Sequence, residues 1–284
     1  MSQEDNRRID AVLESAVARL SPVSNSAKLD AEVMLCRSID MPRSYLFAHP
    51  EDVLDEAAYR RFDTLVRRRL GGEPMAYIMG TREFWSLELL VSPATLVPRP
   101  ETELLVELAL RHIPRKAEWQ ILDLGTGSGA IAIALASERL MCQITAVDIS
   151  AAALAIAHEN ARQLSLSNIE FAQGSWSEPV GGREFDLIVS NPPYVRSDDE
   201  ALADLRYEPM EALVAGVDGL EAIRTLAADC GQILKKDGVL LIEHGADQPH
   251  EVAAILSGSG WTDIVNHKDI SGHARVTVAR RGGK

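Results

Sequence analysis

The first 80 residues carry apolar side chains at helical spacing. Between residues 9 and 20, apolar positions recur at steps of three and four, as one face of an α-helix requires. Further short helices are predicted, with Ser, Pro and Gly between them, over residues 29–39, 50–59 and 62–70. We therefore expect residues 1–80 to form a small all-α domain.

Residues 81–98 form a connecting segment in this interpretation. The stretch 83–91 is rich in apolar and aromatic residues and predicts a short β-hairpin or an extended linker. Pro93 and Pro98 then favour extended backbone, because proline fixes its own φ and biases the preceding residue away from helix. Thr102 can cap a helix that is predicted over residues 103–112.

From residue 120 onward, apolar runs of strand length alternate with longer segments of helical pattern. The predicted strands are 121–124, 144–149, 169–172, 185–190, 239–243, 262–267 and 275–279. The predicted helices are 130–137, 151–164 and 220–234. Continuous apolar strands that alternate with helices indicate a parallel sheet covered on both faces. The fold class predicted for residues 99–284 is doubly wound α/β, which is Rossmann-like.

Charge argues against a nucleic-acid-binding protein. The net charge of the 284 residues is −13, and residues 81–284 hold 18 Lys/Arg against 29 Asp/Glu. An acidic body repels a phosphate backbone, although a local basic patch can still act. The one basic cluster is predicted to be the solvated face of an amphipathic helix and consists of Arg60, Arg61, Arg67, Arg68 and Arg69.

Targeting signals and metal motifs are not evident. The first residues are polar with no apolar segment behind them, and no apolar run approaches the ~18 residues of a membrane span. The three cysteines are far apart and odd in number, which favours a reducing cytoplasm over a disulfide framework or a zinc site. No spacing of His244, His267 or His273 suits a metal, so we expect structural histidines and no metal.

A glycine-rich loop follows the first predicted strand of the α/β part. It reads Gly125-Thr126-Gly127-Ser128-Gly129 and is preceded by Asp123. Glycines permit positive φ and let the backbone approach a ligand closely. The dinucleotide fingerprint is G-x-G-x-x-G, and this loop departs from that spacing. The G-x-G-x-G form is typical of methyltransferases, in which it wraps the methionine part of S-adenosylmethionine. An incidental strand-to-helix turn is the alternative.

Two further residues extend the predicted cofactor site. Asp148 ends the second strand, 23 residues after Gly125, close to the ~20-residue offset at which an acid reaches a ribose hydroxyl. We assign Asp148 to the ribose diol, with a capping role for the next helix as the alternative. Trp176 follows the third strand and can stack on the adenine or line its pocket. A buried core tryptophan is the alternative there.

The fourth strand ends in Asn191-Pro192-Pro193-Tyr194, across the crevice from the glycine loop. An amide or amino nitrogen is a poor nucleophile because its lone pair is delocalised. The Asn191 side-chain oxygen and the Pro192 carbonyl can accept hydrogen bonds from the two N–H groups of the acceptor nitrogen. These bonds would aim the nitrogen lone pair at a methyl carbon. The prolines Pro192 and Pro193 stiffen the loop, and Tyr194 can pack on the planar acceptor. Alignment of this kind can contribute roughly 7–11 kcal/mol to catalysis.

With these motifs in place, the chain resembles the release factor glutamine methyltransferases, the PrmC/HemK family. The resemblance covers nearly the whole chain from Gly72 on and, more loosely, the helical part. Beyond the motifs above, it rests on Gly72-Glu73-Pro74, Tyr77-Ile78, Gly80, Glu83-Phe84, Pro98-Arg99-Pro100-Glu101-Thr102-Glu103, Tyr207-Glu208-Pro209, and Glu243-His244-Gly245 with Gln248.

This resemblance implies a helical domain, a β-hairpin and a seven-stranded S-adenosylmethionine-dependent methyltransferase domain. The implied acceptor is the N5 amide nitrogen of the glutamine in the Gly-Gly-Gln tripeptide of bacterial class 1 release factors. Residues 1–80 of this chain would recognise the surface of the release factor. Carried over residue by residue, the cofactor would be bound by Gly125 to Gly129, Asp148, Trp176 and Asn191, and the glutamine by Asn191 to Tyr194. Arg99 and Glu101 either shape the acceptor pocket or fix the linker to the sheet. We expect a monomer.

Two other functions stay open at this point. An adenine-N6 DNA methyltransferase also uses an Asn/Asp-Pro-Pro-Tyr loop, but it must flip a base and hold a long phosphate track. The net charge of residues 81–284 and the lack of a basic, aromatic-bearing insertion argue against it. A catalytically silent S-adenosylmethionine-binding module is the other alternative, and the intact Asn191–Tyr194 loop argues against that.

Overall fold

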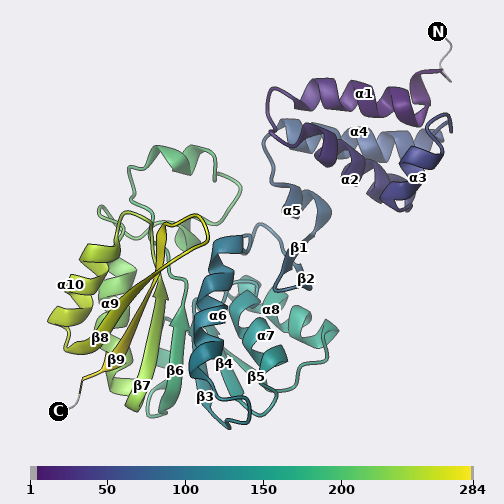
Figure 1. Cartoon of the computed structure of the whole chain (residues 1–284). Helices are drawn as coiled ribbons and strands as arrows, with labels where there is room; N and C mark the ends of the chain where they lie inside the picture. Colours follow the sequence, from purple (N-terminus) through teal and green to yellow (C-terminus); the bar gives the residue numbers. More distant parts are fainter. Residues whose placement is uncertain (1–4, 283–284) are drawn as a thin grey trace. The chain divides into compact units, whose positions relative to one another are not determined.

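The computed structural model describes residues 5–282, and the chain divides into two compact units, Met1–Gly80 and Thr81–Lys284. The first unit is helical, as predicted (Figure 1). Its helices are α1 (Ile9–Leu20), α2 (Ala27–Ile39), α3 (Arg43–Ala48), α4 (Glu56–Leu70) and α5 (Met75–Met79). They bury a common apolar core that includes Leu20, Met34, Leu35, Phe62 and Val66.

The predicted division of residues 50–70 into two helices is wrong. One helix, α4, runs unbroken from Glu56, and residues 50–55 are not helical. The Asp55 carboxylate accepts a hydrogen bond from the Ala58 N–H at 2.6 Å, which is the interaction of an N-cap residue. The start of α4 is therefore fixed by this polar cap and not by the apolar spacing. The short helices α3 and α5 were also not predicted.

The arginine cluster of α4 is only partly a solvated face. Arg60 and Arg67 are largely exposed and pair with acidic residues one turn away. The other three side chains tie α4 to its surroundings: Arg61 to the Ser38 carbonyl, Arg68 to Glu73, and Arg69 to Asp30. Glu73 of the Gly-Glu-Pro motif is thus held by an ion pair with α4. All five guanidinium groups are engaged within the unit.

A two-stranded hairpin opens the second unit. Strands β1 (Thr81–Phe84) and β2 (Leu87–Leu90) are antiparallel and joined by Trp85 and Ser86. Both turn residues have positive φ, 53° and 57°, as a type I′ turn requires, although neither is glycine. The Trp85 N–H donates to Glu103 at 2.9 Å, and its indole N–H donates to Glu138 at 3.1 Å. These bonds anchor the turn to two helices of the same unit.

A seven-stranded sheet forms the centre of the second unit, in the order β5-β4-β3-β6-β7-β9-β8. Neighbours among the first five strands in this order are parallel, and β9 runs antiparallel to both of its neighbours, β7 and β8. The strands are β3 (Gln120–Leu124), β4 (Gln143–Asp148), β5 (Ile169–Gln173), β6 (Phe185–Ser190), β7 (Leu234–Glu243), β8 (Trp261–Lys268) and β9 (Ala274–Arg281). The predicted fold class is confirmed, and β7 begins earlier than predicted.

Alternate residues of the strands feed two cores, one on each face of the sheet. Ile121 and Leu187 point to the face covered by α6 and α7, whereas Leu122 and Ile188 point to the face covered by α9 and α10. The helices of this unit are α6 (Glu103–His112), α7 (Ala130–Glu138), α8 (Ala151–Gln163), α9 (Glu221–Ile233) and α10 (Pro249–Gly258). Helix α10 was not predicted. Burial on both faces explains why the strands read as continuous apolar runs.

The hairpin turn yields a stability prediction. A non-glycine residue in the left-handed region costs roughly 1–2 kcal/mol. Replacement by glycine removes this cost, but glycine also has more conformational freedom in the unfolded chain, which offsets part of the stabilisation. Ser86→Gly should therefore raise the free energy of unfolding by about 0.5–1 kcal/mol in urea titrations. Ser259→Gly is the matched control, because Ser259 has a φ of −91° at the end of α10. An equal gain in both variants would contradict the assignment of strain to Ser86.

Candidate active site

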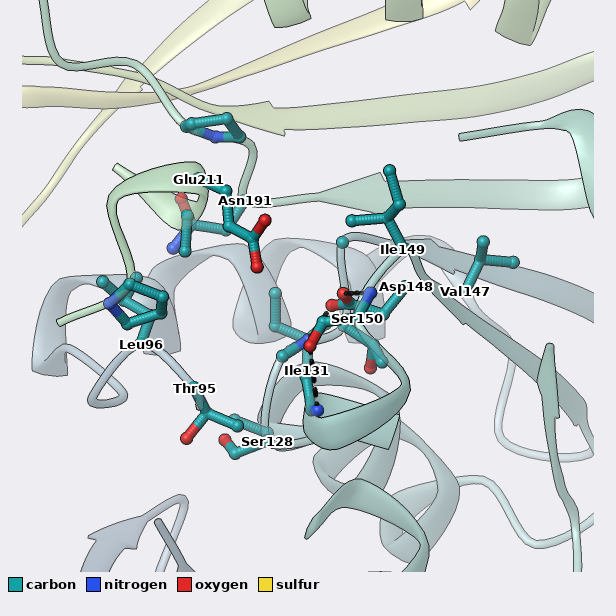
Figure 2. A pocket seen from close by; sticks show the side chains of 18 of the residues that line it. Thr95, Leu96, Ser128, Ile131, Val147, Asp148, Ile149, Ser150, Asn191 and Glu211 are labelled. Carbon is teal, nitrogen blue, oxygen red and sulfur yellow. Dashed lines mark hydrogen bonds between the residues drawn. The ribbon is translucent and has the colours of Figure 1, made fainter. Parts of the chain in front are cut away.

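A cavity of about 290 Å³ lies at the carboxyl ends of β3, β4 and β6. Figure 2 shows Thr95 and Leu96 on one side of it, Asp148 and Ile149 on the other, and Asn191 and Glu211 near its upper end. The predicted cofactor residues that line it are Gly125, Thr126, Gly127, Ser128, Asp148, Trp176 and Asn191. The folding of the chain thus brings together residues from four separate segments of the sequence.

The glycine loop has the backbone shape that was expected. Gly125, Gly127 and Gly129 have φ values of 74°, 57° and 84°, which other residues adopt only at a cost. The Gly125 and Thr126 N–H groups donate to the Val147 carbonyl at 2.9 and 3.0 Å, which holds the loop against the end of β4. Gly129 does not line the cavity. A Cβ there would lie 3.1 Å from the Ala157 Cβ, so it allows α7 and α8 to pack closely.

The Asp148 carboxylate bridges the glycine loop and the start of α8. Its Oδ2 accepts the Gly127 N–H at 2.8 Å, and its Oδ1 accepts the Ser150 N–H at 2.9 Å. The capping alternative fails for Asp148, because the Ser150 side chain itself caps α8 by accepting the Ala153 N–H. Asp148 is half-buried on the cavity wall, with its carboxylate orientation fixed by two backbone donors.

Trp176 lies between the core of the second unit and the cavity. Its side chain packs against the core under α9 and α10, and it also lines the cavity. A Cβ on Gly125 would lie 3.8 Å from the indole Cζ3, so the ring lies beside the glycine loop. The residue has a φ of 46°, which turns the chain sharply after β5.

Asp123 lies below the loop and is fully buried. Its Oδ2 accepts the Thr126 hydroxyl at 2.6 Å and the Ala132 N–H at 3.2 Å, whereas its Oδ1 has no partner in the described part of the chain. Burial raises the pKa of this carboxyl from 3.8 to about 7, although the Thr126 bond acts in the opposite direction. Asp123 thus holds the loop from beneath, at a cost in solvation.

Asn191 emerges beside Glu243 because of the register between their strands. Ser190 of β6 pairs with Ile242 of β7, so the next residues of the two parallel strands are neighbours at the carboxyl edge. The Asn191 Nδ2 donates to the Thr102 hydroxyl at 3.2 Å. The Asn191 Oδ1 is buried and accepts no hydrogen bond from residues 5–282. An unpaired buried acceptor of this kind typically costs about 1–3 kcal/mol, which a bound donor would recover.

A second cavity, of about 280 Å³, adjoins the first at Asn191. It is lined by Leu96, Arg99, Asn191, Pro192, Tyr194, Val195, Leu205, Ala212 and Leu213. Leu96, Arg99, Asn191 and Ala212 border both cavities. Of the predicted acceptor loop, Pro192 and Tyr194 line only the second cavity, and Pro193 lines only the first. Asn191 therefore stands between a space beside the glycine loop and a space beside Tyr194.

The Tyr194 segment is held by Gln248. The Gln248 Nε2 donates to the Tyr194 carbonyl at 3.1 Å and to the Gly219 carbonyl at 3.3 Å. A Cβ on Gly219 would lie 2.4 Å from the backbone carbonyl oxygen of Tyr194, so only glycine fits at this position. Burial, together with the nearby Glu243 carboxylate, raises the pKa of Tyr194 to about 12, which keeps the phenol protonated.

Arg99 pairs with a residue of the loop after β6. Its guanidinium pairs with the buried Glu208 at 2.5 Å, and the Val97 N–H donates to the same carboxylate at 3.0 Å. This ties the linker to the Tyr-Glu-Pro motif of the loop after β6. Arg99 also borders both cavities, whereas Glu101 is exposed and is not among the described lining residues of either.

The expectation that Thr102 caps α6 by its side chain is wrong. Helix α6 does begin at Glu103, but the Thr102 hydroxyl makes no capping bond. It accepts a hydrogen bond from Asn191 instead, and it also interacts with the buried Glu243 carboxyl and lowers the pKa of that group. The residues that sequence reasoning missed are those of the irregular cavity walls, notably Thr95, Leu96, Glu211 and Ala212. The motifs Pro98–Glu103 and Tyr207–Pro209 flank them and were the only signal in the sequence.

The remaining expectations concern metals, cysteines and membranes. His244 is fully buried and hydrogen-bonded to the Gly245 carbonyl and the Thr277 hydroxyl, as a structural histidine would be. Within residues 5–282, no group of three or more potential ligands could hold a metal, and Cys36, Cys142 and Cys230 are free thiols. None of the described helices has the length and apolar character needed to cross a membrane.

Comparisons with known proteins match both units. A model of the PrmC N-terminal domain matches residues 11–80, and a model of the methyltransferase small domain matches residues 101–253. A release factor glutamine methyltransferase of Vibrio cholerae is 47% identical over 276 residues, which is 96% of each chain. One from Coxiella burnetii is 44% identical over 264 residues, covering 93% of this chain and 95% of the relative.

A crystal structure of a methyltransferase from Pyrococcus furiosus has the same fold, with a TM-score of 0.54 at 17% identity over 76% of this chain and 98% of that one. The fold and the site thus define a methyltransferase built on a doubly wound sheet. The sequence identity of 44–47% to relatives over more than 90% of the chain shows which methyltransferase family it is. The chain belongs to the release factor glutamine methyltransferase family.

The buried Asp123 predicts a pH dependence of stability. Its pKa is raised in the folded state, so its contribution is present below the unfolded pKa and is lost as the pH rises through about 7. Between those limits the folded chain keeps a proton that the unfolded chain releases, a slope of up to about 1.4 kcal/mol per pH unit. Asp123→Asn should make the fall in unfolding free energy from pH 5 to pH 7 shallower.

Urea unfolding at several pH values in that window measures the slope. Asp237→Asn is the control, since Asp237 is exposed, and it should keep the wild-type slope. An Asp123→Asn variant with an unchanged slope would contradict the assignment of this pH dependence to Asp123.

Proposed function

We propose that this chain transfers a methyl group from S-adenosylmethionine to the N5 amide nitrogen of the glutamine in the Gly-Gly-Gln tripeptide of class 1 peptide chain release factors. The observation that carries the proposal is the position of Asn191, which borders two adjoining cavities and has a buried side-chain oxygen without a partner among the described residues. One cavity suits a methyl donor beside the glycine loop, and the other suits a planar amide beside Tyr194. The names of the curated relatives support the choice of substrate.

The residues that line the first cavity suit S-adenosylmethionine by their chemistry. The Gly125–Gly129 loop offers close backbone approach to the methionine part, and the Asp148 carboxylate is placed for a ribose diol. Trp176 offers an aromatic wall for the adenine, and the first cavity also contains Ile149 and Ser150 next to Asp148. When bound there, S-adenosylmethionine supplies an activated methyl group on a cationic sulfur.

The second cavity is the proposed seat of the glutamine side chain. The Asn191 Oδ1 accepts one N–H of the amide and the Pro192 carbonyl accepts the other, which aims the nitrogen lone pair at the methyl carbon. Tyr194 packs on the amide plane as a neutral phenol. The new N–C bond forms as the methyl–sulfur bond of the donor breaks, which leaves S-adenosylhomocysteine, and the nitrogen loses one proton to solvent. Alignment and exclusion of water account for the catalysis, and these residues need no strong base for it.

The parts outside the two cavities complete the proposal. The unit of α1 to α5, which matches the PrmC N-terminal domain, recognises the release factor away from its glutamine. The linker of residues 81–98 and the catalytic part of residues 99–284 form the second unit. We place the enzyme in the cytoplasm as a monomer that acts on protein and does not bind nucleic acid directly.

Replacement of Asn191 tests the acceptor site. With a class 1 release factor and methyl-labelled cofactor, Asn191→Ala should lower kcat/KM by roughly 10- to 100-fold, because the amide loses its positioning acceptor at a cost of about 1–3 kcal/mol. The measurement is label transfer located on the tripeptide glutamine by mass spectrometry. A release factor with that glutamine replaced and duplex DNA serve as controls. Label on either control, at the rate of the intact factor, would refute the substrate assignment.

Replacement of Asp148 tests the cofactor site separately. Asp148→Ala removes the proposed ribose acceptor and the two backbone bonds that order the loop. The dissociation constant for S-adenosylmethionine, measured by calorimetry, should rise roughly tenfold or more, as the loss of charged hydrogen bonds predicts. Asp186→Ala is the control, because Asp186 lies near the start of β6, away from the cavity at the carboxyl end of that strand, and pairs with Lys235. Equal cofactor affinity in wild type and Asp148→Ala would contradict this role.

A further inference from the structure

The Thr102 hydroxyl links Asn191 to a buried carboxyl group. The Asn191 Nδ2 donates to this hydroxyl at 3.2 Å, and the hydroxyl also interacts with the Glu243 carboxyl and lowers its pKa. Thr102 is 4% exposed and Glu243 is 1% exposed. The second carboxylate oxygen of Glu243 has no partner in the described part of the chain. A carboxylate held in this way is costly to bury, and neither strand pairing nor core packing requires one.

The protons carried by Thr102 and Glu243 determine which end of the Asn191 side-chain amide faces a ligand. The two ends of an asparagine amide are nearly equal in size, so their hydrogen bonds decide which end faces a ligand. A carboxylate can only accept, so the single hydroxyl proton of Thr102 goes to Glu243. Thr102 then has only lone pairs left for Asn191 and must receive its NH2 group. The carbonyl end of Asn191 is left without a donor, as observed.

We propose that Glu243 is a positioning residue for methyl transfer, acting through the Thr102 hydroxyl to keep the carbonyl oxygen of Asn191 available to the acceptor amide. This inference rests on the proposed function of Asn191. The reverse orientation would place the NH2 of Asn191 against the NH2 of a glutamine, two donors in contact. The arrangement therefore selects for an acceptor that brings N–H groups.

The groups that face Glu243 come from the elements around it. They are Arg99, Glu101 and Thr102 from the segment before α6, Tyr194 from the loop after β6, and Arg275 from β9. Burial raises the pKa of Glu243 to about 7, with Thr102 and the two arginines acting in the opposite direction. A protonated Glu243 can donate to Thr102, which frees the hydroxyl to donate to Asn191 and releases the constraint. Activity should therefore rise as the pH rises through about 7.

The test compares four enzymes on an intact release factor: wild type, Glu243→Gln, Thr102→Val and Thr102→Ser. Glutamine can donate to Thr102, and valine has no hydroxyl, so both variants lose the constraint. Their kcat should fall on the order of tenfold or more, with little change in the KM for the cofactor. Thr102→Ser keeps the hydroxyl and should recover most of the rate. The pH-dependent rise near 7 should disappear in Glu243→Gln.

Glu32→Gln is the matched control, because Glu32 is equally buried but lies in the helical unit, and it should keep the wild-type pH profile. Thermal unfolding shows whether each variant is folded, and if Glu243→Gln is not, the Val and Ser variants of Thr102 decide the matter. Equal rates for Thr102→Val and Thr102→Ser, or an unchanged pH profile in folded Glu243→Gln, would overturn the positioning role. Wild-type enzyme that leaves the release factor unlabelled would refute the proposed function instead.

Discussion

The register of the parallel strands β3, β4, β6 and β7 is the constraint on which the site depends. Because these strands end at the same edge, the residues at their ends lie along it in the order Asp148, Gly125, Asn191 and Glu243, although they span residues 125 to 243 of the sequence. A slip of one residue would exchange the side chains that pack into the two cores, and the close packing within each core opposes this exchange. The chemistry is thus positioned by hydrophobic packing beneath it.

Buried polar atoms without partners show where this fold gives up stability. The unpaired side-chain atoms in the described residues are Arg82 Nε, Asp123 Oδ1, Asn191 Oδ1 and Glu243 Oε2. The last three lie on residues at the carboxyl edge of the sheet, where each would be expected to cost about 1–3 kcal/mol. A fold selected for stability alone would replace them with apolar groups. Of the three residues, Asn191 borders both cavities, whereas Asp123 and Glu243 are buried and are not among the described residues that line either cavity.

The sequence was most informative where local patterns determine structure. The strands 121–124 and 185–190 were recognised because burial on both faces makes them continuously apolar, and the glycine loop because positive φ demands glycine. Thr102 was misread because the capping rule is local, whereas its actual partner, Asn191, is 89 residues away. The walls formed by Thr95, Leu96, Glu211 and Ala212 have no periodicity, so only the folded chain reveals them. The roles of the site residues themselves stay predictions.

The central claim is that Asn191 presents its carbonyl oxygen to an amide nitrogen at the junction of the two cavities. A crystal structure of the enzyme with S-adenosylhomocysteine and a Gly-Gly-Gln peptide tests it most directly. The account predicts the glutamine Nε2 at about 3 Å from the Asn191 Oδ1, with the Asn191 Nδ2 still on Thr102. A glutamine amide seated elsewhere, or one that meets the NH2 end of Asn191, would contradict it.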